Sequence, residues 1–302
     1  MSQIHQFNHT AMKTTFVLRI VSDDATQAHN AAHAAITRID EIENTLSRYI
    51  EGSDVFRINH MHAGQTLFIS ETCYDCLRLA TDAHAQTGGR FDITLGALIE
   101  HQKNARNGSA PSITGALRID PDRPMITCDA PGREIDLGGI GKGYALDQLK
   151  DLLKEWDIES ALVSAGASTQ LAFGSKTWPI ELSGDAYQLT IELNNQALSA
   201  SGVGIQGSHI VSPSECNEPA TYPYKRAWIV QPNAALADAW STALMLIDND
   251  LLRDFEAPEN ALYFETSSGI QTLEQIQATI TLSSRLHRIT ATRDTHVLKP
   301  SA

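Results

Sequence analysis

The chain has 302 residues, enough for one large domain or two closely packed ones. Its 36 acidic residues outnumber 23 basic residues and give a formal net charge of −13, which argues against nucleic acid and anionic membranes as partners because both repel such a surface. No apolar run reaches the roughly 18 residues of a membrane span, and the N-terminus lacks the basic start and apolar core of a signal peptide, so we expect a cytoplasmic protein.

Helix and strand signals alternate irregularly along the chain. Alternation over 14–22 predicts a strand, and the alanine-rich stretch after it has the spacing of a long helix. A second helix is predicted over 70–89, which starts on a Ser-Glu pair and ends on Gly-Gly. Residues 104–134 are rich in turn formers and indicate loops with one short hairpin. A strand, a glycine-rich turn, an amphipathic helix and several short strands follow without a regular βαβ repeat, which predicts the α+β class.

The four cysteines, Cys73, Cys76, Cys128 and Cys216, are too few and too scattered for a disulfide framework. Cys73 and Cys76 form a C-x-x-C pair, a pattern that elsewhere carries redox chemistry or binds zinc. This pair lies inside a predicted amphipathic helix, and no second pair follows it in the sequence. We therefore interpret both as reduced thiols that lie in the core or are half-buried.

The stretch "IDLGGIGKGYALD" (135–147) places four glycines beside Lys142, where a predicted strand meets a helix. Glycines there allow the backbone to approach a ligand closely, and amide N–H groups with a lysine suit a phosphate. The spacing matches neither Walker A nor the dinucleotide-binding G-x-G-x-x-G pattern. A tight turn with an exposed lysine explains the stretch equally well.

The stretch "ADAWSTALML" (237–246) sets Asp238 and Thr242 four residues apart, with Ser241 beside them, at the head of an apolar run. The spacing puts Asp238 and Thr242 on one helical face. Carboxylate and hydroxyl oxygens are hard ligands that suit Mg²⁺, which shares its shell with water and substrate phosphates. The alternative is an aspartate that caps the helix or interacts with its dipole.

Three further residues carry weaker signals. Asp92, which follows a Gly-Gly turn, is either a site residue or the acceptor of an Asx turn. Tyr49 is either a packing residue or a platform for a flavin. His209, in a loop rich in glycine and serine, is either solvated or a general base.

Taken in order, "AMKT", "LSRY", "GGRFDIT", "IDLGGIGKGYALD", "ASG", "SHIVSP" and "ADAWSTAL" resemble the motif series of the FAD:protein FMN transferase (ApbE) family over about residues 12–246. The resemblance implies an ApbE-like α+β fold with mixed or antiparallel sheets, in which residues 1–302 form a single domain of two intimately packed α+β lobes. It also implies FAD as the donor substrate, Mg²⁺ as the metal, and transfer of FMN to a threonine or serine of an acceptor flavoprotein subunit, with release of AMP. An FAD-binding protein that has lost transfer, or an Mg²⁺-dependent FAD pyrophosphatase, is the alternative.

The resemblance also assigns site residues. Positions that match FAD contacts are Met12, Tyr49, Arg90, Phe91, Asp92, Asp136 and Lys142. The metal positions are the carbonyl of Gly139 and the side chains of Asp238, Ser241 and Thr242, with His209 as the candidate base and Asp238 counted as catalytic. The chain departs from the family pattern at Lys13, where a glycine is usual, at Ser212, where an aspartate is usual, and over 165–169, where an acid is missing.

Overall fold

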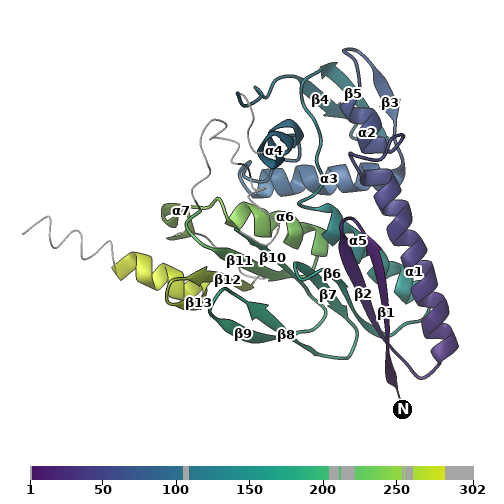
Figure 1. The fold of residues 1–302 in the computed structure, drawn as a ribbon, viewed down its shortest axis with the longest axis vertical. Helices are drawn as coiled ribbons and strands as arrows, with labels where there is room; N and C mark the ends of the chain where they lie inside the picture. The colour runs from purple at the N-terminus through teal and green to yellow at the C-terminus, as the bar shows by residue number, and fades with distance from the viewer. Residues whose placement is uncertain are drawn as a thin grey trace, which may run out of the picture.

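The computed structural model describes residues 2–104, 109–203, 211, 222–253, 255 and 261–282, and its helices and antiparallel sheets confirm the α+β class (Figure 1). Among these residues the largest element is an eight-stranded sheet in which all neighbouring strands are antiparallel. In spatial order its strands are β1 (Gln3–Ala11), β2 (Thr14–Ser22), β6 (Ser160–Ala165), β7 (Thr169–Phe173), β10 (Ala197–Gly202), β11 (Arg226–Gln231), β12 (Ala261–Thr266) and β13 (Gly269–Thr272).

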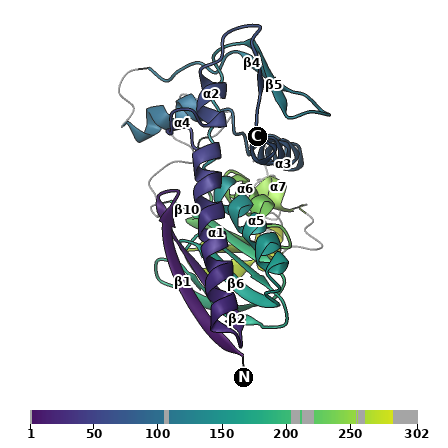
Figure 2. The same cartoon turned by 90° about the vertical axis from the view of Figure 1, so that its right-hand side faces the viewer.

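Both faces of this sheet are covered. On one face lie α1 (Ala25–Leu46), α5 (Gly141–Glu155) and α6 (Ala234–Leu244), and Figure 2 shows α1 running along the strands. On the other face the hairpin of β8 (Trp178–Ser183) and β9 (Gln188–Leu193) packs Trp178 against Leu162 and Trp228. Because side chains alternate along a strand, the strands in the middle of the sheet contribute to both cores; β6, for example, places Val163 in one and Leu162 in the other.

The rest of the chain forms a smaller part beside the large sheet. It contains α2 (Asp54–Asn59), α3 (Glu71–Gln86), α4 (Gly96–Lys103) and a sheet of β3 (Thr66–Phe68), β5 (Met125–Ala130) and β4 (Ala116–Ile119). Helix α3 lies across the junction and packs against α6 (Figure 1). One buried cluster includes Leu77 of α3, Ile126 of β5 and Phe16 of β2, so the apolar core is continuous through both parts. A short helix, α7 (Asn249–Arg253), follows α6.

Local signals placed α1 and α3 correctly, whereas the short helix α2 between them was not predicted. Asp24 caps α1 by accepting the N–H groups of Thr26 and Gln27, and Ser70 caps α3 by accepting the N–H of Cys73. Cys73 and Cys76 are fully buried, which confirms their interpretation as core residues. Strand β1 was not predicted; it pairs with β2 along its whole length. No helix of the described ranges is both long enough and apolar enough to cross a membrane.

Candidate functional site

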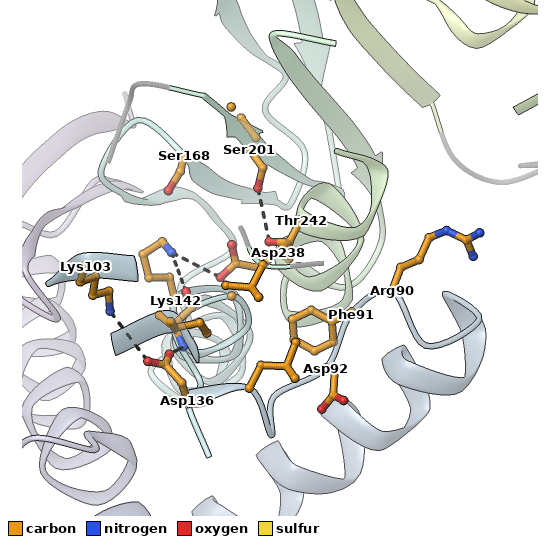
Figure 3. A pocket seen from close by; sticks show the side chains of 17 residues that line it. Arg90, Phe91, Asp92, Lys103, Asp136, Lys142, Ser168, Ser201, Asp238 and Thr242 are labelled. Carbon is orange, nitrogen blue, oxygen red and sulfur yellow. Dashed lines mark hydrogen bonds and ion pairs between the residues drawn. The ribbon is translucent and has the colours of Figure 1, made fainter. Parts of the chain in front are cut away.

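A cavity of about 210 Å³ opens where the smaller part meets the large sheet. Its walls come from the 90–95 segment, α4, the glycine-rich turn before α5, the end of β10 and helix α6 (Figure 3). The side chains at its centre are Lys142 and Asp238, which face each other. The cavity therefore gathers the two strongest motifs of the sequence into one place.

Asp238 is only 3% exposed, and donors from three elements hold its carboxylate. Oδ1 accepts hydrogen bonds from Thr169 Oγ1 at 3.3 Å and Ser199 Oγ at 3.2 Å, and Oδ2 accepts one from the Gly143 N–H at 3.1 Å. The Lys142 ammonium lies 3.7 Å from Oδ2. The N-cap of α6 is Asn233, which accepts the N–H of Leu236. The alternative in which Asp238 caps its own helix is therefore wrong.

Helices α5 and α6 hold each other's N-termini. Asp238 of α6 accepts the N–H of Gly143 in the first turn of α5, and Asp147 of α5 accepts the N–H groups of Ala234 and Ala235 at 3.1 and 2.9 Å. Each carboxylate satisfies donors that have no partner within their own helix. A Cβ atom at Gly143 would lie 2.1 Å from the Ala234 carbonyl oxygen, so the close approach requires glycine. Asp147 was not predicted as a site residue, because its partners on α6 are 87 and 88 residues away in the sequence.

Hydroxyl groups line the wall beside Asp238. Thr242 Oγ1 and Ser201 Oγ face the cavity and lie 3.4 Å apart. Ser241 is fully buried behind them, where its hydroxyl donates to the Asp238 carbonyl at 2.9 Å and lies 2.9 Å from Ser201 Oγ. Ser199 and Ser201 were not predicted as site residues; both fall on one face of β10 because they are two residues apart.

The glycine-rich turn brings backbone close to α6. A Cβ atom at Gly139 would lie 3.4 Å from Thr242 Oγ1 and 3.0 Å from the Phe91 ring, so the Gly139 backbone passes between these side chains. The Lys142 ammonium donates to the Gly138 carbonyl at 3.3 Å and thus spans the turn. Phe91 is buried at 4% exposure and forms the cavity wall next to the turn.

Asp136 precedes the turn and lies within a cluster of cations. Its carboxylate accepts the Gly138 N–H at 2.8 Å and lies 3.4 Å from Arg48 and 3.8 Å from Lys103. Arg48 also pairs with Glu134. These contacts fix Asp136 at the entrance to the turn.

A second cavity, of about 480 Å³, adjoins the first and shares Asp136, Gly138, Lys103 and Lys142 with it. Met12 and Tyr49 line this second cavity and not the first, which places both residues away from Asp238. Tyr49 is 49% exposed, and its hydroxyl donates to Glu100 at 3.1 Å and accepts from Lys103 at 3.2 Å.

Two of the predicted FAD contacts point elsewhere in this structure. The Arg90 side chain extends away from Asp238 and donates to the Thr87 carbonyl at 3.3 Å (Figure 3). Asp92 accepts the Thr94 N–H at 2.7 Å and lies 3.9 Å from Arg133, so the Asx-turn alternative describes its contacts. Both residues nevertheless belong to the lining of the first cavity. His209, the candidate base, and Ser212 lie outside the described residues.

The oxygens around Asp238 suit a hard divalent cation. They comprise one buried carboxylate and the hydroxyl of Thr242, which lines the cavity and can donate its proton to the Asp238 carbonyl 3.4 Å away. Over the described ranges there is no cluster of three or more His, Cys, Asp or Glu side chains that could hold a metal. A cation here would thus take part of its coordination shell from water and substrate, as Mg²⁺ usually does in proteins.

Comparisons with known proteins identify relatives of the whole fold. Residues 12–262 match the model of the ApbE family. A protein of Salmonella typhimurium named FAD:protein FMN transferase is 26% identical over 285 residues, which cover 84% of this chain and 81% of that protein. The apo crystal structure of the Pseudomonas stutzeri flavinyl transferase ApbE superimposes with a TM-score of 0.77 at 25% identity, covering 90% of this chain and 94% of the other. The crystal structure of the ApbE protein of Thermotoga maritima superimposes with a TM-score of 0.75 at 26% identity, covering 91% of this chain and 99% of the other.

Proposed function

We infer that this chain, which belongs to the ApbE family, is an FAD:protein FMN transferase. The observation that carries the inference is the position of Asp238, Lys142 and Thr242 in a cavity that shares Lys142 and Asp136 with a second one lined by Met12 and Tyr49. A dinucleotide that joins a flavin to a nucleotide through a pyrophosphate needs two such neighbouring spaces, with charged groups between them.

In the proposed reaction a hydroxyl oxygen of a protein threonine or serine attacks the phosphorus on the riboflavin side of FAD. The new oxygen–phosphorus bond forms, the bond to the AMP oxygen breaks, AMP leaves, and the hydroxyl proton passes to a base. Such transfers depend mainly on positioning and on neutralising charge. Lys142 supplies a positive charge at the point where the cavities meet, and His209 remains our candidate for the base.

We propose that Asp238, Thr242 and the Gly139 carbonyl hold Mg²⁺, with Ser241 supporting Thr242 through Ser201. The metal, when bound, would withdraw negative charge from the pyrophosphate. The fold already orients Asp238 through Thr169, Ser199 and Gly143. The carboxylate would therefore lose little freedom when it binds a cation.

We assign the flavin half of FAD to the cavity lined by Met12 and Tyr49, and the pyrophosphate to the region between Lys142 and Thr242. Asp136 lies where the cavities meet and would contact the linker between the two halves. Phe91 forms the apolar wall for the remaining half. Arg90 and Asp92 join this set only if their side chains turn toward the ligand.

The test is incubation of the purified chain with FAD and Mg²⁺, with and without a peptide that contains an acceptor threonine. We expect AMP together with a peptide that has gained one FMN by mass spectrometry. AMP with free FMN alone would show a pyrophosphatase, and bound FAD without AMP would show a protein that has lost transfer; either result refutes the assignment.

The metal assignment has its own test. Asp238→Asn keeps the shape of the side chain but removes its charge, and we expect it to abolish the effect of Mg²⁺ on FAD affinity, measured by titration calorimetry. Asp129→Asn is the matched control, because Asp129 pairs with Arg118 on the surface hairpin of β4 and β5. A full Mg²⁺ effect in the Asp238→Asn variant would contradict the assignment.

A further inference from the structure

The loop between β1 and β2 has an unusual second residue. Ala11 pairs with Thr14, so Met12 and Lys13 form a two-residue hairpin loop, and both have positive φ angles of 50° and 58°. Such loops favour Gly, Asn or Asp because other side chains are strained in the left-handed region. A lysine kept in this conformation suggests that its side chain has a use.

The Lys13 side chain lies on the ring of Tyr49. Its ammonium is 4.2 Å from the ring centroid, which is well within the range of a cation–π contact. Arg48 and Lys103 lie farther out, at 5.7 and 5.8 Å from the same centroid. Lys13 and Tyr49 both line the second cavity, so the ammonium covers ring surface that this cavity offers to a ligand.

We propose that Lys13 determines the affinity of the site for the flavin half of its donor by competing with the isoalloxazine for the face of Tyr49. The proposal rests on the function proposed above, in which the flavin occupies this cavity. An aromatic ring that stacks on Tyr49 cannot share the face with an ammonium 4.2 Å from the centroid. The ligand must therefore break the cation–π contact, and the flexible stem of lysine allows the ammonium to move away.

The competition is selective for one half of the ligand. Lys13 lines the second cavity, whereas Asp238 and Thr242 line the first. A nucleotide such as ADP has a pyrophosphate but no flavin to stack on Tyr49. Its binding therefore leaves the contact between Lys13 and Tyr49 in place. The ratio of FAD affinity to ADP affinity is thus the quantity that Lys13 controls.

The test compares Lys13→Ala and Lys13→Arg with the unsubstituted chain by calorimetric titration with FAD and, separately, with ADP. Lys176→Ala is the matched control, since Lys176 is an exposed lysine 5.1 Å from the Trp178 ring, on the opposite face of the large sheet. We expect Lys13→Ala to bind FAD about two- to five-fold more tightly, the factor that corresponds to an exposed cation–π contact. Lys13→Arg should bind FAD no more tightly than the unsubstituted chain, and ADP affinity should stay constant throughout.

Two failures are distinguishable. If FAD binds but Lys13→Ala leaves its affinity unchanged or weaker, the competition is refuted while the proposed function stands. If FAD binds to neither the unsubstituted chain nor any variant, the proposed function fails and this inference falls with it. A gain in affinity that extends equally to ADP also overturns the proposal, because the effect would then be a general change of charge.

Discussion

Gly141 and Gly143 lie two residues apart in the first turn of α5 and have opposite surroundings. A Cβ atom at Gly143 would lie 2.1 Å from the Ala234 carbonyl oxygen and 2.8 Å from the Ala235 Cα, both of which belong to the backbone of α6. A Cβ atom at Gly141 would meet nothing within 4 Å. Substitution of each by alanine therefore tests whether the contact between α5 and α6 is as close as the structure describes.

The Gly143→Ala variant must separate the two helices by roughly 1 Å or more to relieve the overlap. Overpacking of this kind costs about 1–3 kcal/mol. The movement also stretches the buried hydrogen bond from the Gly143 N–H to Asp238, and loss of a bond to a charged group costs about 1.5–3 kcal/mol. We expect a total loss of about 3–5 kcal/mol in the free energy of unfolding, whereas Gly141→Ala should gain up to about 1 kcal/mol because alanine restricts the unfolded chain.

Urea denaturation followed by circular dichroism measures both values on otherwise identical proteins. Equal slopes of free energy against urea concentration would show that the variants unfold to comparable states. If Gly143→Ala is within about 1 kcal/mol of the unsubstituted chain, the backbone contact is not tight. The account of how Asp238 is held in place would then be wrong.

Two further predictions concern buried titratable groups. Burial raises the pKa of Asp147 above its ordinary value, although two backbone N–H donors oppose the shift. The folded state then binds the proton more tightly than the unfolded state, so the stability advantage over Asp147→Asn should shrink from about pH 4 upward; a growing advantage in urea titrations would contradict this. Burial also raises the pKa of the Cys73 and Cys76 thiols. Both should stay unreactive toward a thiol reagent until denaturant is added, and fast labelling of either one in the folded protein would disprove their burial.

Signals that lie close together in the sequence predicted their part of the fold well. The helix over 70–89 was found because its cap, its apolar spacing and its terminal glycines all lie within one short segment. Asp238 and Thr242 were singled out for the same reason, since Thr242 follows Asp238 by one helical turn; both line the first cavity, and their role as metal ligands stays a prediction. From the continuous buried cluster we propose that the chain forms a single domain of two packed lobes, as the family resemblance implied.

Contacts between distant segments could not be predicted in this way. Thr169 and Ser199, which donate to Asp238, precede it by 69 and 39 residues, and only the order of strands in the sheet brings them together. The exchange of caps between α5 and α6 likewise depends on how two helices cross. Even Asp92, whose Asx-turn partner Thr94 is local, could not be assigned from sequence, because an aspartate in a turn and one in a site have the same pattern.

Most of the residues that hold Asp238 in place are different from the residues that line the two cavities. Burying a carboxylate costs several kcal/mol unless partners compensate, and for Asp238 this compensation comes from Gly143, Thr169, Ser199 and the ion pair with Lys142. Of these four, only Lys142 lines a cavity. Lys13, where the family pattern usually has a glycine, lines the second cavity, which we propose for the flavin, and it is not among the residues that hold Asp238. Residues that line the cavities can therefore be substituted while Asp238 keeps its position, because hydrogen bonds from Gly143, Thr169 and Ser199 hold its carboxylate.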